Sequence, residues 1–144
     1  MVHSAKLLVL GYLFLVATVA WAADAPVEIA SQIVFSSNRS GPWRIWSIRA
    51  DGSDLQQLTQ AGADEQDVDP VLSPDGQSLL FSSTRGGTTG VWRAWSDGSQ
   101  AARICDGDQA EWSPDGKSIA FRRAEQIQLR DLTSGIERRL SPAD

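Results

Sequence analysis

The chain has 144 residues, of which 42% are hydrophobic and 22% charged, as is usual for one globular domain. The 13 basic and 18 acidic residues give a formal net charge of −5. An acidic chain without a cluster of lysines and arginines argues against nucleic-acid binding, because neutralising phosphates requires a basic surface.

Residues 1–22 have the pattern of a secretory signal peptide. Lys6 provides a positive charge, "LLVLGYLFLVATVA" an apolar core, and Ala20-Trp21-Ala22 the small residues that signal peptidase inspects. We expect cleavage after Ala22, a periplasmic or secreted protein, and no membrane span in the mature chain. The alternative is an uncleaved N-terminal anchor.

Cysteine is used once in the sequence, at Cys105. A single cysteine cannot form an intrachain disulfide, even in the oxidising compartment that the signal peptide indicates. We expect Cys105 to be a small buried apolar side chain, with an intermolecular disulfide or a reactive thiol as the alternative, and stability to come from packing alone.

Residues 23–144 contain an internal repeat. The segment 33–53, "IVFSSNRSGPWRIWSIRADGS", aligns without a gap with 79–99, "LLFSSTRGGTTGVWRAWSDGS". A third copy, "SIAFRRAEQIQLRDLTSGIERRL", keeps the apolar spacing but has a shorter internal hairpin. The repeat periods of 46 and then 40 residues are typical of stacked units such as propeller blades.

Each repeat divides into four short predicted strands. The turn "SPDG" occurs at residues 73–76 and 113–116, where proline presets φ, aspartate bonds the local backbone and glycine accepts a positive φ. The following "SLLF" or "KSIAF" alternates its side chains as a strand does, and the turns "NRSG" or "TRGG" and "ADGS" or "SDGS" precede two further strands. After the signal peptide no segment has a sustained helical period, so we expect almost no helix.

The segment "DVDPVLSPDGQSLLFSSTRGGTTGVWRAWSDGS" resembles the TolB-like β-propeller repeat, a relative of the WD-type repeats. In that repeat an Asp-Pro-x-aromatic-Ser-Pro-Asp-Gly run opens each blade. The resemblance covers about residues 31–142 and implies an all-β fold. We expect about three four-stranded blades, at approximately 27–60, 67–106 and 107–142, forming an incomplete propeller or half-ring.

The repeats depart from the family pattern in three places. Leu72 replaces the usual aromatic residue, Ala110 replaces the proline, and the first unit has no strand that ends in "SPDG". Propellers typically close with four to eight blades. We therefore expect either a homo-oligomer that completes a ring or a longer propeller of which this is the front part. A truncated reading frame without independent function is a third alternative.

The sequence contains none of the common catalytic patterns. Its one histidine, His3, lies in the signal peptide, and neither a G-x-S-x-G elbow nor a phosphate-binding glycine loop is present. We predict that the chain is not an enzyme and has no cofactor, but binds a protein or cell-envelope component. The alternative is the propeller portion of a larger secreted enzyme, since similar propellers occur in serine peptidases and pectin-degrading lyases.

Four carboxylates occur together in "ADEQDVDP", at the start of the second unit: Asp64, Glu65, Asp67 and Asp69. Their oxygens could bind Ca²⁺, but the spacing does not match an EF-hand loop. The alternative interpretation is a solvated acidic loop, so we predict a binding role for these residues without a defined metal site.

Two W-x-x-W pairs are the remaining candidates. Residues i and i+3 of a strand point to opposite faces, so neither pair can form one flat surface. Trp46 and Trp92 coincide in the repeat alignment and are predicted to pack between sheets. Trp43 and Trp95 are predicted to be exposed contact residues, and Glu111 completes the candidate binding set.

Overall fold

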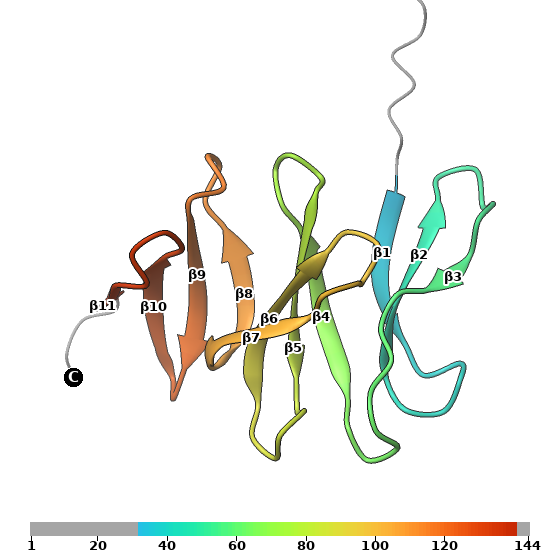
Figure 1. Cartoon of the computed structure of the whole chain (residues 1–144), viewed down its shortest axis with the longest axis horizontal. Coiled ribbons are helices and arrows are strands. Elements are labelled where there is room, and N and C mark those ends of the chain that lie inside the picture. Colours follow the sequence, from blue (N-terminus) through green and yellow to red (C-terminus); the bar gives the residue numbers. More distant parts are fainter. Residues whose placement is uncertain (1–31, 141–144) are drawn as a thin grey trace, which may run out of the picture.

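The computed structural model describes residues 32–140, which form three antiparallel sheets (Figure 1). The first sheet comprises β1 (Gln32–Ser37), β2 (Arg44–Arg49) and β3 (Gln56–Gln57). The second comprises β4 (Asp67–Leu72), β5 (Ser78–Ser83), β6 (Gly90–Trp95) and β7 (Ala102–Asp106). The third comprises β8 (Asp108–Trp112), β9 (Ser118–Arg123), β10 (Gln126–Asp131) and β11 (Glu137–Arg139).

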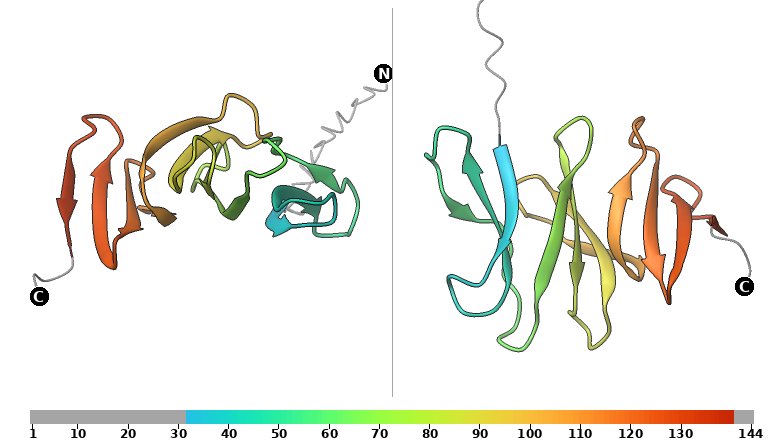
Figure 2. Two further views of the ribbon diagram at one scale, coloured as in Figure 1. Left: turned by 90° about the horizontal axis from the view of Figure 1, so that it is seen from below. Right: turned by 180° about the vertical axis from the view of Figure 1, so that it is seen from behind.

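The predicted all-β fold is confirmed, and the second sheet lies between the other two (Figures 1 and 2). The second and third sheets have the expected four strands, whereas the described part of the first has three. Residues 32–140 hold no helix that could serve as a membrane span. The predicted signal peptide lies outside the described residues.

The shorter hairpin of the third repeat is also present. Residues 38–43 connect β1 to β2, and residues 84–89 connect β5 to β6, but only Ala124 and Glu125 connect β9 to β10. These two residues have φ values of 46° and 66°. Positive φ at both central positions matches a tight two-residue turn to the twist of the flanking strands.

The "SPDG" turns are closed by their own side chains. The hydroxyl of Ser73 donates to Asp75 Oδ1 at 2.5 Å and accepts from the amide of Ser78 at 2.9 Å. The Ser113 hydroxyl makes the same two bonds at 2.6 and 2.9 Å, to Asp115 and from Ser118. The repeated sequence thus encodes a complete local hydrogen-bond set that joins each innermost strand to the next one.

The apolar core consists of two clusters, one at each junction between neighbouring sheets. The first joins Ile45 and Leu58 to Leu79, Phe81 and Ala94. The second joins Leu80 and Val91 to Ala110, Ile119 and Phe121. All six residues of β5 are buried, because alternate side chains of this strand enter opposite clusters.

β4 and β8, the innermost strands of the second and third sheets, each contain a bulge whose backbone bonds to the preceding sheet. The β4–β5 register shifts between Val68 and Val71, and Asp69 within the bulge has φ 53°. Its amide donates to Ser36 Oγ in the first sheet at 3.2 Å. Gln109, with φ 50°, repeats this contact with Ser82 Oγ at 3.0 Å. The bulge turns one amide out of the ladder, toward the adjacent sheet.

Cys105 is half-buried against the second cluster, as expected of a small apolar residue. Burial is the main reason that its pKa is raised to about 11, with the Glu137 carboxylate adding to the effect. The thiol is therefore protonated at neutral pH, which agrees with a packing role.

We expect acid to destabilise the fold through its turns. Five turn aspartates have a pKa below the ordinary 3.8, because serine hydroxyls and amides of the same turn donate to the carboxylate: Asp51, Asp75, Asp97, Asp115 and Asp131. Their stabilisation is complete above the unfolded pKa and is lost as pH falls through the lowered native values. The melting temperature, followed by tryptophan fluorescence, should be steady down to about pH 5 and fall below about pH 4. Asp115→Asn should make that fall shallower, whereas a melting temperature that did not change between these pH values would contradict the assignment.

Candidate functional site

The candidate site lies where residues 38–43, 58–66 and 84–89 come together, which we call the loop end (lower in Figure 1). Antiparallel strands place successive connections at alternate ends of a sheet. The "SPDG" turns consequently lie at the opposite end (Figure 1). The loop end contains Trp43 and the acidic segment singled out from the sequence.

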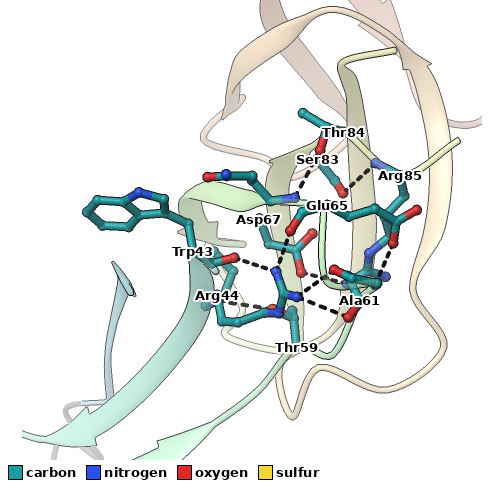
Figure 3. Close-up of polar contacts among 12 residues, drawn as sticks. Trp43, Arg44, Thr59, Ala61, Glu65, Asp67, Ser83, Thr84 and Arg85 are labelled. Carbon is teal, nitrogen blue, oxygen red and sulfur yellow. Dashed lines mark hydrogen bonds and ion pairs between the residues drawn. The ribbon is translucent and has the colours of Figure 1, made fainter. Parts of the chain in front are cut away.

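Arg44 holds the long connection between the first and second sheets in place. Its side chain is only 5% exposed at the start of β2. One guanidinium nitrogen donates to the carbonyls of Trp43 and Glu65, at 2.8 and 2.7 Å. The other donates to the carbonyls of Ala61 and Gly62, at 3.0 and 2.9 Å (Figure 3). A buried cation needs such charge-assisted bonds, so Arg44 and this loop depend on each other.

Asp67 and Arg85 form a buried ion pair at the start of β4. The carboxylate of Asp67 is fully buried, and its Oδ2 accepts from Arg85 Nη2 at 2.7 Å (Figure 3). The Asp67 amide also donates to the Trp43 carbonyl at 3.0 Å. Among the described residues Oδ1 of Asp67 has no hydrogen-bond partner. The carboxylate therefore relies on a single arginine and is not available to a ligand.

The arginine of this pair also covers an aromatic stack. Its guanidinium lies 5.4 Å from the ring centre of Phe81 and 5.2 Å from that of Trp92. Those two rings stack on each other at 6.5 Å. In the first sheet Arg39 lies in the same way over Phe35 and Trp46, at 5.2 and 5.0 Å. Each arginine thus closes the loop end of an apolar layer with a cation–π contact.

An open cavity of about 490 Å³ lies beside this network, between the start of β4 and the loop at 84–89. Its polar lining consists of three carboxylates, four hydroxyls and one carboxamide: Asp64, Asp69, Asp108, Ser82, Ser83, Thr84, Thr89 and Gln66. Asp108 is neutralised by Arg122, whose Nε and Nη2 donate to it at 2.8 and 2.9 Å. Among the described residues no ion pair involves Asp64 or Asp69, so these two carboxylates make the cavity acidic.

The four carboxylates of the acidic segment have three different environments. Asp64 and Asp69 are exposed in the cavity, and Asp67 is buried against Arg85. Glu65 Oε2 accepts from the Gly62 amide at 2.7 Å and so closes its own loop. Within residues 32–140 no three histidine, cysteine, aspartate or glutamate side chains are grouped as a metal site requires. Asp67 and Glu65 therefore have structural roles, and Asp64 and Asp69 remain the binding candidates of the segment.

The remaining candidates are spread over the molecule. Trp43 is 41% exposed at the loop end, with its indole pointing away from the Arg44 network (Figure 3). Trp95 is 47% exposed, at the far end of β6, and Glu111 is exposed on β8. Trp92 packs against the first cluster as predicted. The prediction that Trp46 packs between two sheets is wrong for the described residues. Its side chain is half-buried beneath Arg39, and no described sheet covers that side.

Comparison with known proteins places these features in a family. A family model described as the TolB beta propeller domain matches residues 18–144. The chain belongs to the TolB β-propeller domain family. The comparison with curated proteins finds no match.

Solved structures agree with this family membership. A protein assigned as TolB from Agrobacterium tumefaciens is 26% identical with a TM-score of 0.67, over 76% of this chain and 44% of its own. TolB from Acinetobacter baumannii is 23% identical with a TM-score of 0.65, over 78% and 30%. An oligogalacturonate lyase in complex with manganese is 18% identical with a TM-score of 0.55, over 67% and 28%. The chain thus spans less than half the length of these structures.

The structural roles of three arginines in this TolB-type propeller domain were not predicted from the sequence. Arg39 and Arg85 coincide in the repeat alignment, each four residues after a matched phenylalanine, and this was the available signal. Arg44 has no such signal, since its equivalent in the second repeat is Gly90. In the second sheet Arg103 from β7 lies against Gly90 instead. Position 44 of the first sheet and position 90 of the second are equivalent. An arginine side chain fills the space there in both sheets, but it comes from β2 in the first and from β7 in the second.

We expect Asp67→Ala to destabilise the domain strongly, because it removes the fully buried carboxylate that pairs with Arg85, whose side chain is only 15% exposed. Breaking a buried pair typically costs about 3–5 kcal/mol. Asp64→Ala is the control, since an exposed loop carboxylate should change the free energy of unfolding by less than about 0.5 kcal/mol. Urea denaturation measures both. If Asp67→Ala were as mild as Asp64→Ala, the pair would not have its structural role.

Proposed function

We propose that this propeller domain is a non-catalytic binding module of the cell envelope, which holds a protein or envelope component at its loop end. The observation that carries the proposal is the acidic cavity at the loop end, next to a connection held by Arg44, with Trp43 exposed at the same end of the sheets. An exposed aromatic side chain and a polar cavity on one end of a domain are a common composition of a binding surface.

The chemistry of the cavity indicates what kind of group it accepts. Asp64 and Asp69 supply negative charge, and the surrounding serine and threonine hydroxyls supply acceptors. A lysine or arginine side chain of a partner satisfies both, while Trp43, exposed at the same end of the sheets, offers an apolar contact to another part of that partner. The site therefore suits a basic segment of a protein better than an anionic ligand.

Several observations support binding without catalysis. Residues 32–140 contain no histidine and no group of three metal-binding side chains. The TolB structures support an envelope location, as does the signal-peptide pattern of residues 1–22. Similarity to the oligogalacturonate lyase, at 18% identity, concerns the fold alone. The hydroxyls of Ser82, Ser83 and Thr84 accept hydrogen bonds from backbone amides, and among the described residues none of them donates to a carboxylate that could act as a base.

Site-specific photo-crosslinking tests the proposal. We expect Trp43→p-benzoylphenylalanine to give a discrete adduct in intact cells, because this position is exposed at the loop end, the same end of the sheets as the cavity. The same replacement at Trp95 is the matched control, since the two indoles are similarly exposed, at 41% and 47%, but lie at opposite ends of the sheets.

The acidic cavity is tested in the same experiment. Adding Asp64→Asn and Asp69→Asn should weaken the adduct severalfold, and raised salt should do the same, because both reduce attraction to a basic partner. Equal crosslinking from position 95, or an adduct that survives the double substitution unchanged, would contradict this assignment of the site.

A further inference from the structure

A groove between neighbouring sheets occurs twice at the end of the molecule that carries the "SPDG" turns. At the first junction it is one open cavity of about 470 Å³, lined by residues 32, 47–49, 54, 56, 72, 75 and 76. At the second junction it is two cavities of about 310 and 350 Å³, which share Ser78 and Arg93. The repeat periods of 46 and 40 residues convert every residue of the first lining into a lining residue of these two cavities. The two grooves are therefore equivalent, and their side chains can be compared place by place.

Arg93 on β6 is the main difference between the two grooves. Its counterpart in the first groove is Ser47, which is 1% exposed. The Nε and Nη2 atoms of Arg93 donate to Ser78 Oγ at 3.2 and 2.9 Å, and its guanidinium lies 5.5 Å from the ring centre of Trp112. Because Ser78 is only 3% exposed, these contacts hold the guanidinium in one orientation before a ligand arrives.

The charge of Arg93 is not neutralised by a neighbour. Among the described residues no ion pair involves Arg93, and its hydrogen bonds go to a neutral hydroxyl. The first groove differs, because Arg49 Nε there lies 3.9 Å from Asp54 Oδ2. In the second groove neutral Gln100 takes the place of Asp54. The second groove therefore has a positive charge without the acid that the first groove contains.

The cavity of about 310 Å³, on one side of Arg93, is lined without any carboxylate. Its lining consists of Ser78, Arg93, Ala94, Trp95, Gln100, Ala102, Arg103 and Ile104. Arg103 Nη2 donates to Asp106 Oδ1 at 2.6 Å, so Arg93 supplies the uncompensated charge. Trp95 is 47% exposed at this end of β6. A guanidinium beside an exposed indole and small apolar side chains suits a carboxylate carried on an apolar segment.

The cavity of about 350 Å³, on the other side of Arg93, contains two carboxylates, Asp75 and Asp115. Oδ1 of each accepts from a serine hydroxyl and from an amide of its own "SPDG" turn. These carboxylates stabilise the turns, and their negative charge disfavours an anionic ligand on that side. A carboxylate ligand is therefore expected on the Trp95 side of Arg93.

We propose that the groove between the second and third sheets is a second binding site, which takes an acidic residue of a protein segment. The carboxylate of that residue accepts from the guanidinium of Arg93, and an adjoining apolar side chain of the same segment packs on Trp95. The site has the opposite charge preference to the acidic cavity and lies at the other end of the sheets. It therefore goes beyond the loop-end binding proposed above.

Titration of the purified full-length product with the peptide acetyl-Leu-Glu-Leu-amide tests the site. NMR of ¹⁵N-labelled tryptophan indoles follows binding, and Trp95→Phe and Trp112→Phe identify the two signals of the groove. We expect these two signals to shift and that of Trp43 to stay unchanged. Acetyl-Leu-Gln-Leu-amide should bind at least about tenfold more weakly, because its neutral amide lacks the charge-assisted bond with Arg93.

A matched pair of variants assigns the charge preference to Arg93. Arg93→Gln should reduce binding of the glutamate peptide to the level of the glutamine peptide. Arg49→Gln is the control, since Arg49 lines the equivalent groove, beside Asp54, and should leave binding unchanged. A thermal melt of each variant shows that it is folded. An unshifted Trp95 signal, equal binding of the two peptides, or binding that survives Arg93→Gln would overturn the proposal.

The two proposed sites can fail separately. Asp64→Asn with Asp69→Asn should not change the peptide titration, since both residues line the cavity at the loop end. Conversely, adding Arg93→Gln to both photo-crosslinking variants removes any adduct formed in the groove. Position 95 then remains a valid control for crosslinking from position 43.

Discussion

The packing of one sheet against the next is the interaction on which the rest of this structure depends. A single sheet of three or four short strands has two faces and little apolar surface on either, so it needs a neighbour to bury them. β5 shows the result, because Leu79 and Phe81 enter one cluster and Leu80 the other. Without a disulfide, these two clusters are the main source of apolar stabilisation in the described residues.

Polar groups determine how the sheets fit together at the junctions. The bulges at Asp69 and Gln109 turn an amide toward a serine of the preceding sheet, which fixes the relative position of the two sheets. Arginines then cover the loop end, where Arg85 lies over Phe81 and Trp92 and also neutralises buried Asp67. A binding surface built on such a frame loses little conformational entropy when a partner binds.

The proposed loop-end binding surface and the outer flanks of the end sheets lie on different parts of the molecule. The acidic cavity and Trp43 are at the loop end, whereas Ile33, Ile127 and Leu140 lie on the outer flanks of the end sheets. Propellers generally carry specificity in their loops and stability in their sheet junctions. A change in the loop residues can therefore alter the partner without altering how the sheets pack.

Sequence alone determined the local features of this protein: the "SPDG" turns, the strand alternation, the repeat period and the shorter hairpin of the third repeat. These depend on neighbouring residues, and backbone preferences are sufficient to predict them. Only the tertiary structure decided that Asp67 is buried against Arg85 while Asp69 remains exposed, because the partner arrives from a loop 18 residues away. It also decided that Leu79 is buried and the equivalent Ile33 exposed, because burial requires an adjacent sheet as well as an apolar side chain.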